Sequence, residues 1–134
     1  MIKIILFIWQ IPQNILGLLV ILFTRAKNTG KGFWYTNKKI RFGVSLGNFI
    51  IFSCDYGLGP NEISIKHEQG HQKQSLYLGL LYLILIGIPS FCGNVFDRTF
   101  HRNWEVIKRL RWYYSQPWEK SADNLGKVKR SYVK

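Results

Sequence analysis

The chain has little negative charge and few charged residues of any kind. Asp and Glu together number 7 against 19 Lys and Arg, so the formal net charge is +12, and only 19% of the residues are charged. That share is below the roughly 25% usual for soluble globular domains. A length of 134 residues also excludes two full domains, although it suffices for one domain with a modest core.

Cysteine is scarce as well, and the two cysteines do not lie close together. Cys54 and Cys92 are isolated and form no CxxC pair. We therefore expect both to be small buried apolar residues. A disulfide between them stays open, although nothing in the sequence indicates an oxidising compartment. No small-residue cleavage site follows the apolar N-terminus, which argues against a signal peptide.

The excess of positive charge has two common explanations, binding to nucleic acid and a position beside anionic lipid. The Lys and Arg residues gather in residues 25–41 and 98–111, and each of these segments follows an apolar stretch. Basic loops that flank apolar segments are typical of membrane proteins. The charge distribution therefore favours a membrane partner over nucleic acid.

The first apolar stretch, residues 2–23, is not a clean membrane span. Gln10, Pro12 and the pair at 13–14 interrupt its middle. It could be a kinked transmembrane helix whose polar centre faces protein, or two interfacial segments hinged at Pro12. We expect a kinked membrane anchor helix over residues 1–24, with the following basic loop in the cytoplasm.

A strand and a turn are expected next. The segment Arg41–Ser53 is rich in β-branched and aromatic residues. Breaker residues over Asp55–Asn61 predict a turn, with Asn61 as the N-cap and Glu62 in the first turn of a helix. One side of the strand would carry a candidate substrate-binding edge: Val44, Leu46, Asn48, Ile50 and Phe52.

That helix contains the sequence IKHEQGHQKQ, in which His67, Glu68 and His71 form an HExxH pattern. The two histidines are four residues apart, so their imidazoles project from the same helix face. This spacing lets both coordinate one tetrahedral Zn²⁺. Glu68 is then close enough to take a proton from water at the metal. Gly70, between the two histidines, suggests that a strand backbone passes close by.

A catalytic zinc needs a third protein ligand. The extended pattern HExxHxxGxxH fails because position 77 is Tyr, and His101 lies in a polar run that we expect to be solvated. Glu119 and Asp123 are better candidates, in a short helix that Pro117 would begin. They are again four residues apart, so one carboxylate can bind zinc while the other hydrogen-bonds a ligand histidine.

The pair of motifs HEQGH and EKSAD, some 50 residues apart, resembles the gluzincin zinc metallopeptidases with their HExxH…ExxAD pattern. The chain is similar to small bacterial membrane-associated relatives of the CAAX-prenyl protease and heat-shock protease X type. The resemblance implies His67, His71 and Glu119 as zinc ligands. It further implies Glu68 as the base and later proton donor, and Asp123 as the acid that orients a ligand.

The apolar residues 75–91, expected to continue the HExxH helix until Pro89 and Gly93 end it, constrain the topology. About 16 apolar residues make roughly 24 Å of helix, short for a bilayer core of about 30 Å. If this segment crossed the membrane, Glu119 and the two histidines would lie on opposite sides. We therefore expect a helix that is partly membrane-embedded or buried in protein.

These observations predict an α+β, mainly helical, membrane-associated protein. Residues 25–134 would form a minimal zinc-metallopeptidase-like domain, with a short strand or hairpin beside the HExxH helix. We expect a zinc peptidase that acts on peptide or protein substrates at the cytoplasmic side of a bacterial inner membrane and binds no nucleic acid. Two alternatives stay open: a non-catalytic zinc-binding membrane protein, and a basic nucleic-acid-binding protein with a chance HExxH.

Overall fold

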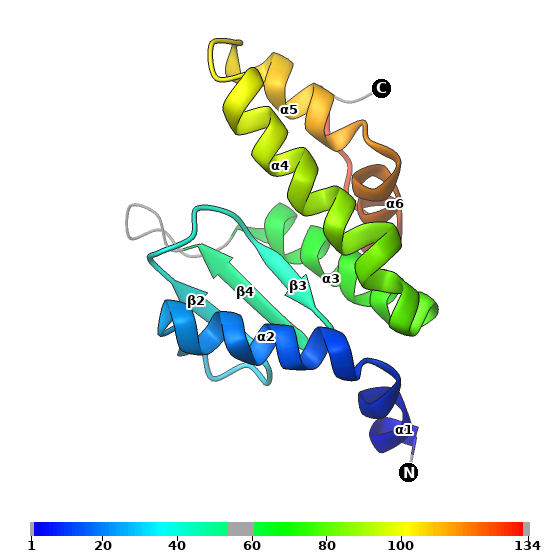
Figure 1. Cartoon of the computed structure of the whole chain (residues 1–134). Helices are drawn as coiled ribbons and strands as arrows, with labels where there is room; N and C mark the ends of the chain where they lie inside the picture. The colour runs from blue at the N-terminus through cyan, green and yellow to red at the C-terminus, as the bar shows by residue number, and fades with distance from the viewer. Residues whose placement is uncertain (1, 54–60, 133–134) are drawn as a thin grey trace.

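The computed structural model describes residues 2–53 and 61–132, which fold into helices around one small sheet (Figure 1). The elements in chain order are α1 (Ile2–Trp9), α2 (Ile11–Thr24), β1 (Lys27–Asn28), β2 (Trp34–Asn37), β3 (Val44–Leu46), β4 (Phe49–Ser53), α3 (Glu62–Leu78), the short helices η2 (Gly79–Leu81) and η3 (Leu83–Gly87), α4 (Ile88–Phe100), α5 (Val106–Tyr114) and α6 (Pro117–Gly126).

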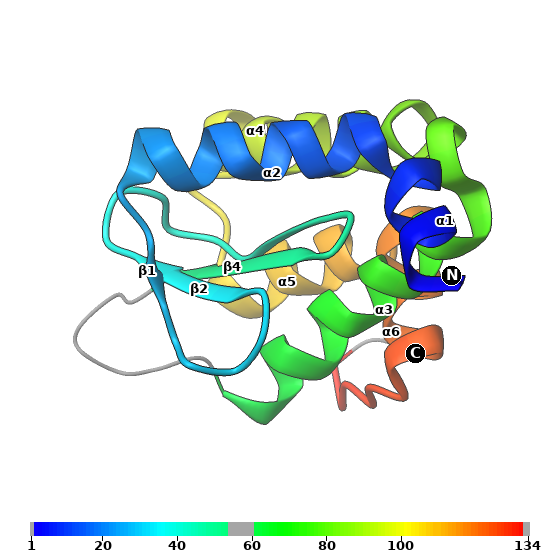
Figure 2. The same ribbon diagram turned by 90° about the horizontal axis from the view of Figure 1, so that it is seen from below.

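The sheet has the strand order β1-β2-β4-β3. Strand β2 pairs with β4 in parallel, and the β1–β2 and β3–β4 pairs are antiparallel. The apolar run Phe49–Phe52 of the central strand β4 is buried and forms the middle of the core. Helices α2 and α4 lie on one side of the sheet and α3 and α6 on the other (Figure 2). The core is thus a thin apolar strand between two helical layers.

The segment predicted as one strand, Arg41–Ser53, is a hairpin instead. Gly47 turns the chain with a φ of +63°, a conformation that favours glycine, so β3 folds back onto β4. Of the candidate substrate-binding residues, Val44 and Leu46 lie on the edge strand β3, while Ile50 and Phe52 lie on the central strand and Asn48 lies in the turn. Of the candidate residues, only Val44 and Leu46 therefore lie on an edge strand.

The prediction of an N-terminal membrane helix is wrong. The segment forms two helices of 8 and 14 residues that break at Gln10. Among the described residues, no helix is both long enough and apolar enough to cross a membrane. The polar residues that interrupt the apolar run are buried against the protein: Gln10 Nε2 donates to Ser75 Oγ at 2.9 Å, and Gln13 donates to the carbonyl of Gly79.

The helix predicted to run on to residue 91 is also broken. Helix α3 ends at Leu78, and Gly79 follows with a φ of +52° and the indole of Trp9 against it, where a side chain would collide. Pro89 and Gly93 do not end a helix, because Pro89 lies in the first turn of α4, where its missing N–H costs nothing. Cys92 of α4 is exposed, contrary to the expectation, and Cys54 lies outside the described residues.

Candidate metal centre

Helix α3 carries the HExxH residues and begins where the sequence predicts. The side chain of Asn61 accepts a hydrogen bond from the backbone N–H of Ser64 at 2.8 Å, which caps the helix. The predicted turn before it lies outside the described residues, apart from Asn61. His67, Glu68 and His71 are all buried, on the side of α3 that faces the protein interior.

Helix α6 supplies the two predicted acids and packs against α3. Pro117 lies in its first turn, as predicted, and both Glu119 and Asp123 are buried. The two helices approach so closely that a Cβ added to Gly70 would lie 1.9 Å from the carbonyl oxygen of Ala122. The backbone that requires a glycine at position 70 thus belongs to a helix, not to the strand that the sequence suggested.

The three predicted ligands form one group. One oxygen of Glu119, Oε2, lies 3.0 Å from Nε2 of His67 and 3.3 Å from Nε2 of His71. The ligand atoms of the three residues all lie within 4.8 Å of one another. Ligand atoms 2.0–2.1 Å from a tetrahedral zinc ion stand about 3.3 Å apart, so the observed separations suit such an ion with little movement.

Both histidines have a second partner that fixes the ring and leaves Nε2 free to face the metal position. Nδ1 of His67 lies 2.7 Å from Oδ1 of Asp123, as the second acid of the pair was predicted to do. Nδ1 of His71 lies 2.7 Å from Oε1 of Gln74, whose amide donates to the carbonyl of Trp118. Such partners set the orientation of a metal-binding imidazole and strengthen it as a ligand. Gln74 was missed, although its spacing of three residues from His71 on one helix was a signal.

The charges around His67 favour a cation at this position. Burial alone would lower the pKa of the His67 imidazole, but hydrogen bonds to Asp123 and Glu119 outweigh burial and raise this pKa to about 9. Burial would likewise raise the pKa of Glu119, yet the two histidines hold it well below its usual range. Asp123 is held by Arg130, whose guanidinium donates to both carboxylate oxygens at 2.7 and 3.0 Å. The site therefore stabilises positive charge between its carboxylates.

Glu68 lies beside this group and has an unused oxygen. Burial raises the pKa of its carboxyl group. Its Oε2 atom is buried without a hydrogen-bond partner among the described residues. A Cβ added to Gly43 would lie 2.4 Å from its Oε1 atom, so the chain just before β3 passes directly over the carboxylate. A buried carboxylate oxygen without a partner is costly, so Glu68 has an acceptor atom to offer to a donor that enters this site.

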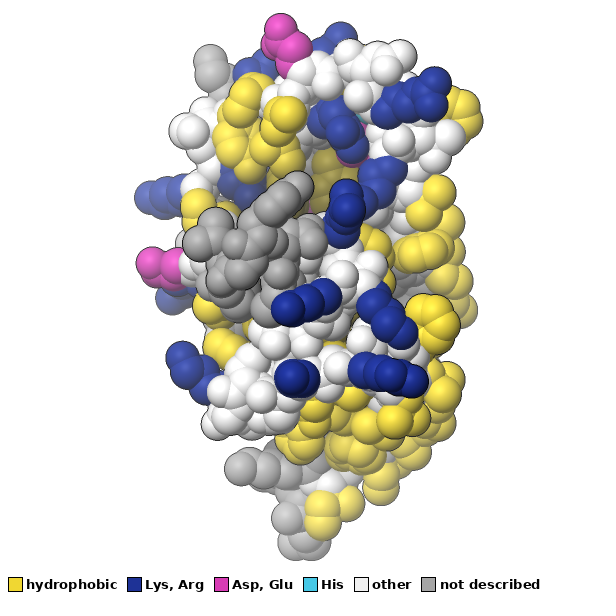
Figure 3. Space-filling model, turned by 90° about the vertical axis from the view of Figure 1, so that its left-hand side faces the viewer, with side chains coloured by type: hydrophobic (Ala, Val, Ile, Leu, Met, Phe, Trp, Pro, Cys, Tyr) yellow, Lys and Arg dark blue, Asp and Glu magenta, His cyan; other side chains and the backbone are white. Residues whose placement is uncertain are grey.

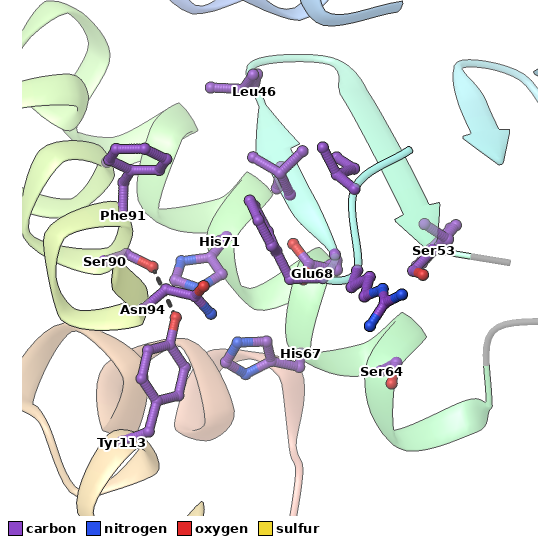
Figure 4. A pocket seen from close by; sticks show the side chains of 18 of the residues that line it. Leu46, Ser53, Ser64, His67, Glu68, His71, Ser90, Phe91, Asn94 and Tyr113 are labelled. Atoms are coloured by element: carbon purple, nitrogen blue, oxygen red, sulfur yellow. Dashed lines mark hydrogen bonds between the residues drawn. The ribbon is translucent and has the colours of Figure 1, made fainter. Parts of the chain in front are cut away.

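The two histidines and Glu68 line a cavity of about 860 Å³ between α2, β3 and α4. Figure 4 shows Tyr113 and Asn94 on the side of the two histidines away from Glu68. Ser90 connects this wall to the ligands, because its hydroxyl donates to Oε1 of Glu119 and lies 3.3 Å from the hydroxyl of Tyr113. None of these residues was predicted, because they come from α4 and α5 and no sequence spacing relates them to HExxH.

His101, the rejected ligand candidate, is not part of the group, and the expectation that it is solvated is wrong. The ring is buried and stacks on Trp104 with centroids 3.7 Å apart. Its Nδ1 lies 3.2 Å from Asp97, which in turn accepts hydrogen bonds from Arg109. His101 therefore belongs to a structural network where α4 meets α5.

A buried set of His67, His71 and Glu119 could thus hold a metal ion, with Asp123 and Gln74 as orienting partners. The geometry does not identify the metal by itself, but two imidazoles and one carboxylate suit zinc and other divalent first-row transition metals. Comparisons with protein-family models, with curated protein sequences and with solved structures found no match to this chain.

Proposed function

We propose that the chain is a zinc-dependent metallopeptidase. The observation that carries this proposal is the position of Glu119 Oε2, at 3.0 and 3.3 Å from the two histidine Nε2 atoms and next to a glutamate with an unused oxygen. Two His and one carboxylate with an open fourth position are the ligands of catalytic zinc in several peptidases. The resemblance to the HExxH…ExxAD pattern of gluzincins supports the same assignment.

The chain's own residues divide the chemistry between them. When bound, zinc acidifies water toward a pKa near 7 and polarises a carbonyl oxygen. Glu68 accepts the proton of the attacking water and returns it to the leaving amine. We assign to Tyr113 the donor to the developing oxyanion, because its side chain lines the same cavity as the two histidines and a phenol O–H stays protonated at neutral pH.

The edge of β3 is the proposed place for a peptide substrate. A peptide can add a strand to an exposed sheet edge through main-chain hydrogen bonds. The carbonyl of Ser45 already accepts a hydrogen bond from the hydroxyl of Tyr82 at 3.0 Å. Gly43 is exposed and lies against Glu68, so its backbone is the better partner for an added strand.

Metal content and peptide cleavage, measured together, test this proposal. Purified protein is expected to bind about one zinc ion per chain and to cleave an unfolded protein such as casein. Glu68→Gln should keep the zinc and lose activity by about 10²–10⁴-fold, because it removes the proton acceptor and no ligand. Glu62→Gln is the matched control: Glu62 lies on the same helix but is exposed, and it should behave as wild type.

Two results would overturn the proposal in different ways. Zinc bound by both wild type and Glu68→Gln, with no cleavage by either, would favour the non-catalytic zinc protein. If the wild type binds little zinc and His71→Ala binds the same amount, the HExxH residues bind no metal. That result would favour the alternative of a basic nucleic-acid-binding protein.

A further inference from the structure

Helix α2 presents its apolar side outward. Leu22 and Phe23 are 73% and 77% exposed, and Ile15, Leu18 and Leu19 beside them are also exposed. These positions repeat every three or four residues and so lie on one side of the helix. A helix on the surface of a globular protein in water normally shows the opposite arrangement.

The inward side of α2 is polar, and specific contacts hold it in place. Asn14 accepts a hydrogen bond from the backbone N–H of Asn48 at 2.9 Å, and Gln13 donates to the carbonyl of Gly79. About one turn further along α2, Gly17 lets the helix approach the sheet, since a Cβ there would lie 2.9 Å from the ring of Phe49. These contacts fix the rotation of α2 about its own axis. The apolar side of the helix therefore faces away from the protein.

The chain from η2 to α4 has the same arrangement. Gly93 and Asp97 face inward, and Asp97 accepts hydrogen bonds from Arg109. The outward side carries exposed apolar residues from Leu80 to Phe96. We call this side and the outward side of α2 together the apolar face, made of Ile15, Leu18, Leu19, Leu22 and Phe23 with Leu81, Ile84, Leu85, Ile88 and Phe91.

The two halves of the apolar face share one side of the molecule. Helices α2 and α4 lie in the same layer on one side of the sheet (Figure 2). Between them opens the cavity of the metal centre, lined by Leu16 and Val20 from one helix and by Ile88 and Phe91 from the other. Exposed apolar patches of more than a few hundred Å² on soluble monomers mark interaction sites.

Basic residues border the apolar face where both helices end. Arg25 follows α2 directly, and Arg98 lies in the last turn of α4. Lys39 donates to the carbonyl of Phe23, and Arg98 donates to the carbonyl of Arg41. Figure 3 shows this end of the molecule, with Lys and Arg side chains gathered beside a band of hydrophobic ones. An apolar face with a cationic border matches the chemistry of an anionic lipid surface.

We propose that the apolar face docks in one leaflet of an anionic bilayer, with α2 and α4 in the plane of the membrane and the metal cavity open toward the lipid. Helix α2 has 14 residues, about 21 Å, which is too short to cross a bilayer core of about 30 Å, so we place it in the plane of one leaflet. A second copy is a poorer partner, because it would bring two chains of charge +12 together. This proposal is independent of the peptidase proposal, since docking requires no metal.

Vesicle flotation with the full-length chain tests it. We expect flotation with vesicles of phosphatidylcholine and phosphatidylglycerol, much less with phosphatidylcholine alone, and a decrease as salt screens the basic border. The double variant Leu19→Glu, Leu22→Glu should bind at least about a hundredfold more weakly, because two apolar side chains lose their burial in lipid. Ile63→Glu is the matched control, an exposed apolar residue of α3 outside the apolar face, and should float as wild type.

A probe at Cys92, next to Phe91 of the apolar face, gives a second measurement. Cys92 is exposed on α4, so an environment-sensitive dye attached there, in a chain with Cys54→Ser, should shift to shorter wavelength when anionic vesicles are added. Circular dichroism and zinc content verify that each variant is folded. Equal flotation of wild type and the double variant would overturn the proposal. So would a stable dimer that binds no vesicles and that the double variant dissociates.

Discussion

His67 lies between two acids and meets each with a different ring nitrogen. Nε2 faces Glu119 and Nδ1 faces Asp123, at 3.0 and 2.7 Å. Asp123 is itself fixed by Arg130, whose guanidinium lies 3.5 Å from the centre of the Tyr114 ring. The orientation of one ligand thus depends on a chain of contacts that reaches past the end of α6.

Replacement of Asp123 by Asn should weaken metal binding without removing a ligand. The amide keeps the size of the side chain but loses the charge that strengthens the imidazole of His67. We expect zinc affinity to fall by about 10–100-fold. Competition with a chromogenic chelator measures this affinity.

Asn124→Ala is the control for that measurement, because Asn124 is the next residue on α6 and is exposed. It should bind zinc as wild type does. An unchanged affinity in Asp123→Asn would contradict the orienting role of Asp123.

At this scale helical spacing predicts which side chains meet. His67, Glu68 and His71 share a helix, as do Glu119 and Asp123, and a spacing of four residues places each set on one face. Tyr113 and Gly43 could not be predicted in this way. Their positions depend on how α5 and the β3 hairpin pack against α3, which no local pattern encodes.

Among the elements, the contact between α3 and α6 determines whether the ligands meet. Two glycines allow it: Gly70 faces the carbonyl of Ala122, and a Cβ on Gly126 would lie 2.0 Å from the carbonyl of Lys66. These contacts lie on either side of the His67–Asp123 pair. Any increase in the distance between the helices would therefore move Glu119 and Asp123 away from both histidines.

Gly70→Ala should separate α3 from α6. The added methyl group collides with backbone, which has no alternative rotamer, so we expect the free energy of unfolding to fall by about 1–3 kcal/mol. Zinc affinity should fall with it. Chemical denaturation and chelator competition measure the two effects.

Gly93→Ala in α4 is the matched substitution. Its nearest contacts would be 3.7–3.9 Å, ordinary van der Waals distances, so it should raise the free energy of unfolding by about 0.5–1 kcal/mol through helix propensity. Equal effects of the two substitutions would show that the close approach at Gly70 is not required.

The ends of the elements show which local signals decide a fold. Asn61 and Pro117 mark helix starts correctly, because capping and a fixed φ act within a few residues. The break at Gly79 was not predicted, and Pro89 was wrongly expected to end a helix. At Gly79 the backbone has a positive φ and the indole of Trp9 packs against it, a contact from 70 residues earlier in the chain that no local pattern encodes; Pro89 is tolerated because it lies in the first turn of α4.

At the scale of the whole molecule, the apolar core is small and polar groups fill much of the interior. Among the described residues, Phe49–Phe52 and a few other apolar residues are buried together with three histidines, two glutamates and three glutamines. The metal centre joins α3 to α6, so a bound ion should contribute directly to the stability of the fold.

Removal of the metal should lower the melting temperature. An ion at a hundredfold excess over its Kd adds about 2.7 kcal/mol, which corresponds to roughly 10 °C for a chain of this size. Calorimetry with and without a chelator measures the shift. Glu68→Gln should show the same shift, and His71→Ala should show almost none. A chelator without effect on the wild type would contradict a stabilising metal site.

The N-terminal segment shows why hydropathy alone gave a wrong architecture. The mean hydropathy of residues 2–23 measures how apolar the segment is. It does not show that the few polar residues lie on one side of a helix. In the structure that side, with Gln13 and Asn14, is the one that contacts the protein. The prediction that the segment is apolar was correct, but the side of the helix that contacts the protein is the polar one.

The contacts on the polar side of α2 also determine when this helix can pack during synthesis of the chain. Its partners lie far ahead in the sequence: Gln13 and the carbonyl of Gly79 are 66 residues apart, and Gln10 and Ser75 are 65 apart. During synthesis α2 therefore leaves the ribosome long before the groups that hold it exist. If the apolar face docks in lipid as proposed, a membrane would cover the apolar side of α2 in that interval, so the proposal predicts that α2 meets the membrane before it packs against the rest of the protein.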